Sequence, residues 1–449
     1  MRSFRLARGV ATFLVGAMLV QLLHACGPQS QSAEKTQLTI ATVNNGDMVV
    51  MQDLSRNFEA DNPDIDLRWV VLEENILRQR TTTDVASQGG QFDVLTIGAY
   101  EAPIWAKRGW LKPLDQLPAE YDVDDLITPI RQGLSQDGTL YALPFYGESS
   151  MLYYRRDLFE EAGITVPENP TYEQVEQWAS QVNDPSSGVY GMCLRGKPGW
   201  GENMAFLTTL VNTNGGQWFD MDWQPQLNTP EWENAVNYYV NILNEYGPPG
   251  ASSNGFNENL ALFSTGKCGM WIDATVAAGL LANPEVSEVS EKVGFAPAPV
   301  ASYPNGSNWL WTWALAIPQT SRSPEAAQKF ITWATSKEYI QLVADQSGWV
   351  SVPPGTRTST YQNPEYQAVA PFASTVLTSI EAADIESPAA SPTPYKGVQY
   401  VDIPEFQAIG TQVGQRMAAA LAGQDSVEQA LRRSQAVAER FMRHTGYIE

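Results

Sequence analysis

After residue 37, short apolar runs alternate with longer stretches in which apolar residues recur every three or four positions. The runs 38–43, 65–72 and 92–98 predict buried strands, and the stretches 48–60 and 75–87 predict the helices between them. Strands and helices that alternate in this way predict a mainly parallel sheet with helices on both faces. Ligands of such sheets gather at the carboxyl ends of the strands.

The same alternation starts again after residues 142–146. Residues 150–154 predict a strand, 172–182 a helix, and 189–194 and 267–272 two further strands. Apolar runs and helical spacing therefore predict a second α/β unit that follows the first along the chain.

A later strand, 311–317, and a helix, 324–335, repeat the alternation of the first unit, so we expect the chain to cross back to it. A chain of 449 residues is also too long for one compact core. The predicted N-terminal lobe comprises residues 38–145 and 308–349, and the predicted C-terminal lobe comprises residues 146–307 and 350–449.

The N-terminus combines a basic start with an apolar stretch, residues 9–23, that is too short to cross a bilayer. The stretch ends in Leu23-His24-Ala25-Cys26-Gly27, which resembles the bacterial lipobox, whose cysteine receives a lipid. We expect a lipoprotein signal peptide over 1–25, lipid attachment at Cys26 and a polar tether over 26–37. The protein is then extracytoplasmic and anchored to a bacterial membrane; an ordinary secretory peptide is the alternative.

The composition of the chain limits the classes of ligand and partner that we expect it to bind. A formal net charge of −22 argues against nucleic acid and favours a neutral or cationic ligand. The 14 tryptophans point weakly to carbohydrate, because indole rings stack on the apolar faces of sugars. His444 is the one histidine beyond the predicted signal peptide, and no cysteine cluster has ligand spacing, so we expect neither a metal nor a cofactor. We expect a monomer.

Two cysteines remain after the predicted lipid site. Cys193 and Cys268 both lie in predicted strands, which can be neighbours in one sheet. An even pair in an oxidising compartment favours a disulfide. Two buried thiols are the alternative, and the sequence leaves both open.

Several segments resemble extracellular solute-binding proteins of family 1, the ligand-capturing components of carbohydrate ABC importers. These segments are 141–144, 257–263, 265–270, 311–318 and 324–330. Similarity to the sorbitol/mannitol-binding branch extends over nearly all of the mature chain, notably in segments 42–47, 73–75, 146–150, 195–203 and 271–275.

The resemblance implies a two-lobed α/β fold of the periplasmic-binding-protein type II. The ligand is expected in the interdomain cleft, which closes by a hinge motion. It also implies permease and ATPase partners and no catalysis. Which polyol or sugar is preferred does not follow from it.

A linear polyol is a string of hydroxyls, so its site needs carboxylates, carboxamides, a fixed arginine donor and an aromatic face. Candidates for the N-terminal lobe follow predicted strands: Asn44, Asn45, Asp47, Glu73, Glu74, Tyr100 and Glu101. Candidates for the C-terminal lobe are Tyr146, Glu148, Arg195, Trp200, Glu202, Asn203 and Asp273, and a further candidate, Arg357, follows a Pro-Pro-Gly turn.

Several candidates have a purely structural alternative. Asn44 and Asn45 precede Gly46 and fit turn chemistry, Asp47 fits a helix cap, and Arg357 fits a bond to a carbonyl.

Trp309, Trp311 and Trp313 alternate along one predicted strand and therefore share a face. The pattern does not tell whether that face meets the core or the cleft. Trp309 lies nearest the crossing between lobes and is the expected stacking partner of the ligand, whereas Trp178 has a helical context that predicts a core position.

A secreted glycoside hydrolase is the rival function, because such enzymes also combine tryptophans with paired carboxylates. Glu73 or Glu74 together with Asp273 fit those roles. Nothing in the sequence marks a carboxyl with a raised pKa, which acid catalysis requires. Binding of another mono- or disaccharide, and a receptor role for a chemosensory partner, remain open.

Overall fold

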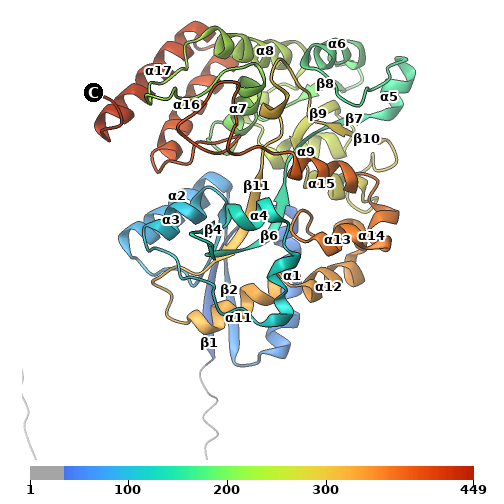
Figure 1. Ribbon diagram of the computed structural model, residues 1–449. Coiled ribbons are helices and arrows are strands. Elements are labelled where there is room, and N and C mark those ends of the chain that lie inside the picture. Colours follow the sequence, from blue (N-terminus) through green and yellow to red (C-terminus); the bar gives the residue numbers. More distant parts are fainter. Residues whose placement is uncertain (1–34) are drawn as a thin grey trace, which may run out of the picture.

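The computed structural model describes residues 35–449, so the predicted signal peptide, Cys26 and most of the predicted tether lie outside it. The chain forms two lobes, one above the other in Figure 1, and each has its own sheet with helices around it. This confirms the predicted two-lobed α/β class.

The lower lobe in Figure 1 holds a five-stranded sheet in the order β2-β1-β3-β11-β6. Its strands are β1 (Thr36–Val43), β2 (Ile65–Leu72), β3 (Val94–Gly98), β6 (Ala142–Glu148) and β11 (Trp311–Ala316). β1 pairs in parallel with β2 and β3, as expected, but β11 is antiparallel to both β3 and β6. β11 runs the opposite way because it returns the chain from the upper lobe.

Helices pack around this sheet. They are α1 (Gly46–Asp61), α2 (Glu74–Ser87), α3 (Glu101–Lys107), α4 (Thr128–Gly133), α11 (Pro324–Ala334), α12 (Lys337–Ser347), α13 (Thr358–Gln362) and α14 (Pro364–Val369), and a small hairpin is formed by β4 (Ser135–Gln136) and β5 (Thr139–Leu140). α1 buries Met48, Met51 and Phe58, and the Phe58 ring meets Phe330 of α11 edge to face. The apolar residues that recur along the predicted helix therefore lie on the side of α1 that faces the sheet.

The upper lobe holds a four-stranded sheet in the order β10-β7-β9-β8. Its strands are β7 (Ser150–Arg155), β8 (Tyr190–Cys193), β9 (Cys268–Ala274) and β10 (Val293–Pro297). β8 and β9 are parallel neighbours, and a disulfide joins Cys193 to Cys268 across them, with the Cα atoms 6.0 Å apart.

The helices of the upper lobe are α5 (Arg156–Glu161), α6 (Tyr172–Val182), α7 (Asn203–Thr213), α8 (Pro230–Tyr246), α9 (Phe256–Ser264), α10 (Ala277–Ala282), α15 (Ala373–Glu381), α16 (Phe406–Leu421) and α17 (Val427–His444). Capping boxes begin two of them, Thr171 with Gln174 at α6 and Ser426 with Gln429 at α17. α7 is buried over its whole length, so it forms the centre of this lobe.

The chain passes between the lobes near the ends of β6 and β11. β6 stays in the lower sheet as far as Glu148, and β7 begins the upper sheet at Ser150. α13 and α14 lie beside α12 in the lower lobe of Figure 1, although the expected division groups residues 350–449 with the other lobe. α15 then packs on β7 and β10 of the upper sheet.

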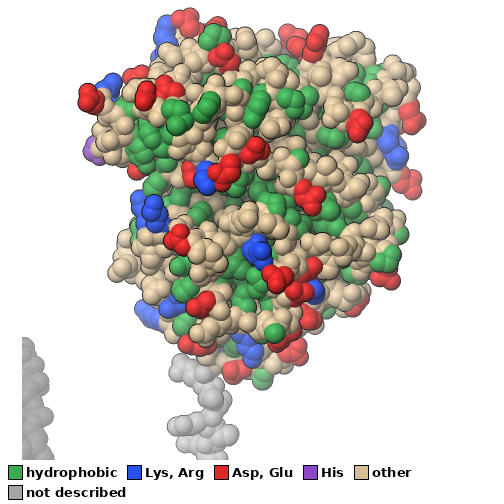
Figure 2. Space-filling view, viewed as in Figure 1, with side chains coloured by type: hydrophobic (Ala, Val, Ile, Leu, Met, Phe, Trp, Pro, Cys, Tyr) green, Lys and Arg blue, Asp and Glu red, His purple; other side chains and the backbone are tan. Residues whose placement is uncertain are grey.

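Acidic side chains are scattered over both lobes on the face shown in Figure 2. This spread fits a solvated surface. Within residues 35–449, no helix is both long and apolar enough to span a membrane.

Candidate functional site

A cavity lies between the lobes, at the carboxyl ends of β1, β2 and β6. Such strand ends are where α/β sheets bind ligands. The cavity is lined by Asn45, Glu74, Arg78, Tyr146, Glu148, Arg195, Trp200, Gly201, Ala205, Phe256, Val276, Trp309, Trp311, Trp313 and Gln399.

Two lining side chains follow strands of the lower sheet. Asn45 comes after β1, and its Nδ2 donates to the hydroxyl of Tyr146 at 2.8 Å, which ties β1 to β6 across the cavity wall. Glu73 caps α2 by accepting a hydrogen bond from the Ile76 backbone N–H, so Glu74 lies in the first turn and reaches the cavity.

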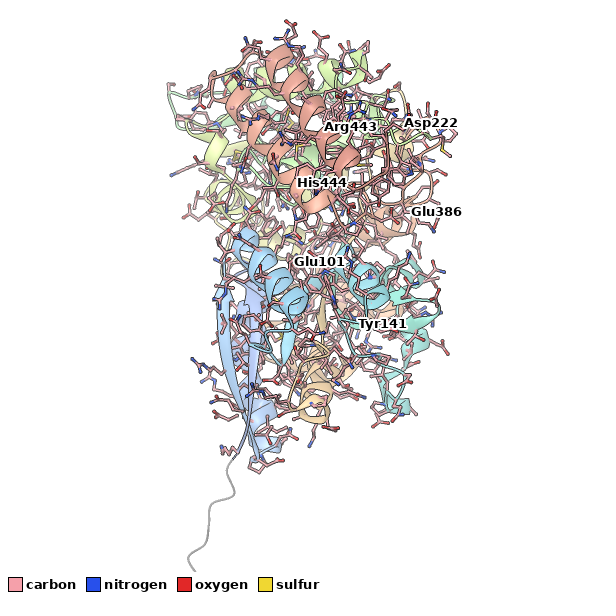
Figure 3. The ribbon with its side chains drawn as sticks, turned by 90° about the vertical axis from the view of Figure 1, so that its left-hand side faces the viewer. Glu101, Tyr141, Asp222, Glu386, Arg443 and His444 are labelled. Atoms are coloured by element: carbon pink, nitrogen blue, oxygen red, sulfur yellow. A yellow bond between two sulfur atoms is a disulfide. The ribbon has the colours of Figure 1, made fainter. Side chains whose placement is uncertain are left out.

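Arg78, on α2, is the centre of a buried cluster. Its guanidinium donates to Glu101 at 2.8 Å and to Glu74 at 3.0 Å. Its central carbon lies over the rings of three tryptophans: Trp200 at 4.2 Å, Trp311 at 4.7 Å and Trp313 at 4.7 Å. Glu101 lies where the two lobes meet in Figure 3. Because Trp200 belongs to the upper lobe, this cation–π cluster spans the boundary.

The tryptophan face of β11 meets the cavity. Trp309, Trp311 and Trp313 all line it, which settles the question that their alternation left open. Gly98 on the neighbouring β3 makes room for one of them, since a Cβ at this position would lie 1.9 Å from the Trp311 ring. The fit therefore requires glycine beside the indole.

Arg195 forms the matching cluster of the upper lobe. Its Nε donates to Asp273 at 2.9 Å, its second terminal nitrogen contacts Asp273 at 2.6 Å, and its first donates to the Gly201 carbonyl at 2.9 Å. Asp273 also accepts from the Trp271 indole at 3.0 Å and from the Ala274 backbone at 2.7 Å. The carboxylate oxygens of Asp273 are thus all engaged by protein donors, Arg195 first among them.

Glu148 is the buried carboxylate without such support. It lines the cavity with only 6% of its surface exposed, and no hydrogen bond or ion pair to its carboxylate occurs within residues 35–449. Burial raises its pKa to about 8, against the lowering effect of Arg195 and with a further raising effect of Asp273 and Glu74. This is the raised carboxyl pKa that the sequence did not reveal.

Charged contacts also bridge the lobes at the rim of the cavity. Lys197 of the upper lobe contacts Glu73 of the lower lobe at 2.5 Å and Glu202 of its own lobe at 3.4 Å. Burial raises the pKa of Glu202 to about 8. The lobes therefore lie close together here.

The structure brings together part of the predicted set. The predicted residues that line the cavity are Asn45, Glu74, Tyr146, Glu148, Arg195, Trp200 and Trp309.

Three other predicted residues lie behind the wall. Asp273 holds Arg195, as described above. Tyr100 donates its hydroxyl to the Ile403 carbonyl and packs on Trp200. Asn203 donates to the Gly414 carbonyl and accepts from the Gly199 backbone. All three are buried, and their polar atoms serve the protein's own hydrogen bonds.

Four further predicted positions, Asn44, Asp47, Glu73 and Arg357, lie apart from the cavity wall. Asn44 is exposed. Glu73 stands at the rim with Lys197. Asp47 lines a separate small cavity with Leu280 and Tyr366, and burial raises its pKa to about 7.

Arg357 does not lie in the cleft; it follows the alternative given for it above, a bond to a backbone carbonyl. It is fully buried in the lower lobe, where it donates to the carbonyls of Thr335 and Asp122 and contacts Asp125 at 3.4 Å. These bonds leave it no path to the cavity.

The sequence prediction missed several lining residues. Arg78 sits inside a helix whose charged residues resemble a solvated face, so no local signal marks it. Gln399 lies outside the helices and strands, and its amide bonds both the N–H and the C=O of Leu310, just before β11. Phe256 and Val276 are ordinary apolar residues that only the fold brings here. Within residues 35–449, no group of histidine, cysteine or acidic residues is arranged to hold a metal ion.

The chain is 56% identical to the mannitol-binding protein of Pseudomonas aeruginosa over 418 residues, which cover 93% of this chain and 95% of that protein. It is also similar to a solved ABC transporter solute-binding protein of Agrobacterium vitis with bound D-mannitol. That similarity has a TM-score of 0.91 and 58% identity, and it covers 92% of this chain and 100% of the other.

A second structure is more distant. It is an ABC transporter solute-binding protein of Agrobacterium radiobacter in complex with ribitol, with a TM-score of 0.80, 28% identity, and coverage of 91% of this chain and 99% of the other. The family described as bacterial extracellular solute-binding protein matches residues 45–341. Its members named here are binding proteins rather than glycoside hydrolases. From its matched sequence, its two-lobed fold and the cavity between the lobes, the chain belongs to the bacterial extracellular solute-binding protein family.

Proposed function

We propose that this protein captures a linear six-carbon polyol, D-mannitol first among them, and delivers it to the permease of an ABC importer. The observation behind the proposal is the cavity between the lobes, walled by tryptophans and by carboxylate, carboxamide, guanidinium and phenol groups. The D-mannitol bound by the Agrobacterium vitis protein supports the choice.

The walls match the chemistry of a polyol. The indole N–H groups of Trp200 and Trp309 have no hydrogen-bond partner within residues 35–449, and ligand oxygens can accept from them. Glu148 offers a carboxyl with no protein partner in the described chain. Tryptophan faces suit the C–H side of the carbon chain. The indole N–H groups and the Glu148 carboxyl thus suit the hydroxyls of an alditol, and the tryptophan faces suit its C–H side.

Closure of the lobes completes the site in this proposal. Arg78 and Glu74 belong to the lower lobe, Trp200 and Arg195 to the upper, and the cavity exists only where both meet. A hinge that parts the lobes opens the cavity for entry and release. The family's transport role supports permease and ATPase partners and an extracytoplasmic location; that the protein is a monomer stays a prediction.

We also propose that Cys26 receives the lipid that anchors the protein to the membrane. Cys26→Ser is expected to move the protein from the membrane fraction to the soluble extracytoplasmic fraction. A processed Cys26→Ser protein that stays membrane-bound in high salt would contradict the anchor.

Calorimetry and mass spectrometry test the ligand. Ligand that co-purifies with the protein is identified by mass spectrometry, and the ligand-free protein is titrated with D-mannitol, sorbitol, ribitol and maltose. We expect the six-carbon alditols to bind with low-micromolar or tighter Kd and maltose to bind far more weakly. Tighter binding of maltose than of any alditol would refute the polyol proposal and keep the family. Nitrophenyl glycosides serve as a check for hydrolysis.

A further inference from the structure

All but one of the charged side chains at the cavity wall and just behind it form ion pairs with one another. Arg78, Arg195 and Lys197 contact five carboxylates between them, from Glu73, Glu74, Glu101, Glu202 and Asp273. Glu148 is a sixth carboxyl group; it forms no ion pair within residues 35–449, although the nearby charge of Arg195 acts to lower its pKa. Glu148 is therefore the carboxyl group of the cavity lining that is left without an ion pair and faces the ligand space.

Glu148 is placed so that a ligand can reach its carboxyl group. It lies at the end of β6, lines the cavity, and is more than nine-tenths buried. A buried carboxylate without a partner is costly, and a cation placed within hydrogen-bond distance relieves that cost. The guanidinium groups nearby cannot serve, because Arg195 is committed to Asp273 and Arg78 to Glu74 and Glu101.

We infer that the cavity also accepts cationic polyols, namely 1-amino-1-deoxyalditols, whose ammonium group pairs with Glu148. The inference rests on the proposed polyol site. A primary ammonium supplies three donors and one positive charge in place of a terminal hydroxyl. The two ends of mannitol are equivalent by symmetry, so an aminodeoxymannitol can present its ammonium to Glu148 from either end.

The carboxyl groups of the cavity exclude anionic relatives of the ligand. An aldonate carries a carboxylate at the same terminal carbon, and near the carboxylates listed above it has no free cation to pair with. Like charges at close range are strongly unfavourable in a site shielded from water. The cavity therefore ranks ligands by the charge of the terminal group: ammonium first, hydroxyl next, carboxylate last.

Protonation gives an independent signature in the unmodified protein. The charged and titratable groups that face Glu148 are Arg195, Asp273, Glu74, Asp47, Tyr146 and Tyr153. With its pKa raised to about 8, Glu148 is mostly protonated at pH 7 when the ligand is neutral. An ammonium favours the carboxylate form, so its binding at pH 7 expels a proton to the buffer.

The test uses D-mannitol, 1-amino-1-deoxy-D-mannitol and D-mannonate. Calorimetry on the full mature protein at pH 7 is expected to give the aminodeoxymannitol a Kd equal to or below that of mannitol, and mannonate a Kd at least 100-fold higher. Titration in two buffers of different ionisation enthalpy is expected to show proton release for the amine and none for mannitol.

Glu148→Gln provides the decisive variant, and Glu160→Gln, which removes an exposed carboxylate of α5, is its matched control. We expect the ratio of the amine Kd to the mannitol Kd to rise at least 10-fold in Glu148→Gln and to stay unchanged in Glu160→Gln. An unchanged ratio in Glu148→Gln, or an amine that binds over 10-fold more weakly than mannitol to the unmodified protein, overturns the inference. If Glu148→Gln fails to fold, absence of proton release in the unmodified protein overturns it. Failure of mannitol itself to bind refutes the proposed function instead.

Discussion

The cavity contains two buried guanidinium groups whose surroundings look alike but whose partners differ. Arg195 bonds to Asp273 and to the Gly201 carbonyl, all within the upper lobe. Arg78 bonds to Glu74 and Glu101 of the lower lobe but also lies 4.2 Å from the Trp200 ring of the upper lobe. Arg195 therefore keeps its contacts when the lobes part, whereas Arg78 loses one of them.

This difference separates two tasks. The Arg195 cluster is built in advance, because one lobe supplies all its partners and holds the donor rigid. The Arg78 cluster is completed only by closure, so its cation–π contact contributes to the closed state. Variants in the two clusters should therefore affect folding and closure to different extents.

The largest expected effect comes from Asp273→Ala. It leaves Arg195 buried without its bidentate partner, and breaking such a pair costs about 3–5 kcal/mol of unfolding free energy. Urea denaturation measures the loss, and Asp222→Ala, an exposed position of the same lobe, is the control. A loss no greater than that of the control would show that the Arg195 cluster is not a folding element.

Trp309→Ala should weaken ligand binding with less effect on folding. The ring lines the cavity, so its removal takes away stacking area and a donor, worth ~1–3 kcal/mol or roughly a 5- to 150-fold rise in Kd for mannitol. Trp178→Ala is the comparison: Trp178 is buried in α6 and packs on Phe159, so it should lower stability and leave affinity nearly unchanged. Equal Kd values for the two variants would remove Trp309 from the site.

Glu148 makes a pH-dependent prediction. Its pKa is raised from 4.5 to about 8 by burial, so the folded state binds the proton more tightly than the unfolded chain. The resulting stabilisation is complete below about pH 4.5 and is lost as the pH rises toward about 8.

Within that window Glu148 alone should lower the unfolding free energy by about 1.4 kcal/mol per pH unit. Denaturant titrations from pH 4.5 to 8 should therefore show a shallower slope for Glu148→Gln. Asp47 and Glu202, whose raised pKa values lie in the same range, keep their contributions in both proteins, so the difference isolates Glu148. Parallel slopes would contradict the prediction.

The smallest effect is expected for Lys197→Met. Its contact with Glu73 joins the lobes at the rim, where Glu73 is 39% exposed, and exposed ion pairs are worth ~0–1 kcal/mol. We expect at most about a 5-fold rise in Kd at low salt, and a smaller one in high salt because ions screen the pair. A large effect that persists in high salt would assign Lys197 to the ligand rather than to the rim.

The sequence predicted the alternating elements of the lower lobe well, because their apolar periodicity reflects burial against one sheet. β6 was missed as a strand. It contains Pro144, which lacks the N–H that a sheet requires, and the pairing register with β11 shifts beside it, between Trp313 and Ala314. The shift in register makes room for Pro144. Because a proline in a short apolar run argues against a strand, the sequence pattern did not predict β6.

The site was predictable where side chains follow strands. Asn45 and Glu74 were found because strand ends meet at one edge of a sheet. Arg78 and Gln399 were not, because their role depends on contacts between segments far apart in the sequence. Asp273 was predicted to contact the ligand; in the structure its oxygens accept from Arg195 behind the cavity wall, a contact that no pattern in the sequence reveals.

The three indole rings around Arg78 also give the molecule an optical reporter of its own. Indole emission responds to a nearby positive charge, and Trp200 faces Arg78 only while the lobes are together. Parting of the lobes removes one ring from the charge and leaves Trp311 and Trp313 beside it. The emission of Trp200, obtained as the difference from a Trp200→Phe protein, thus follows opening and closing in real time without any attached dye.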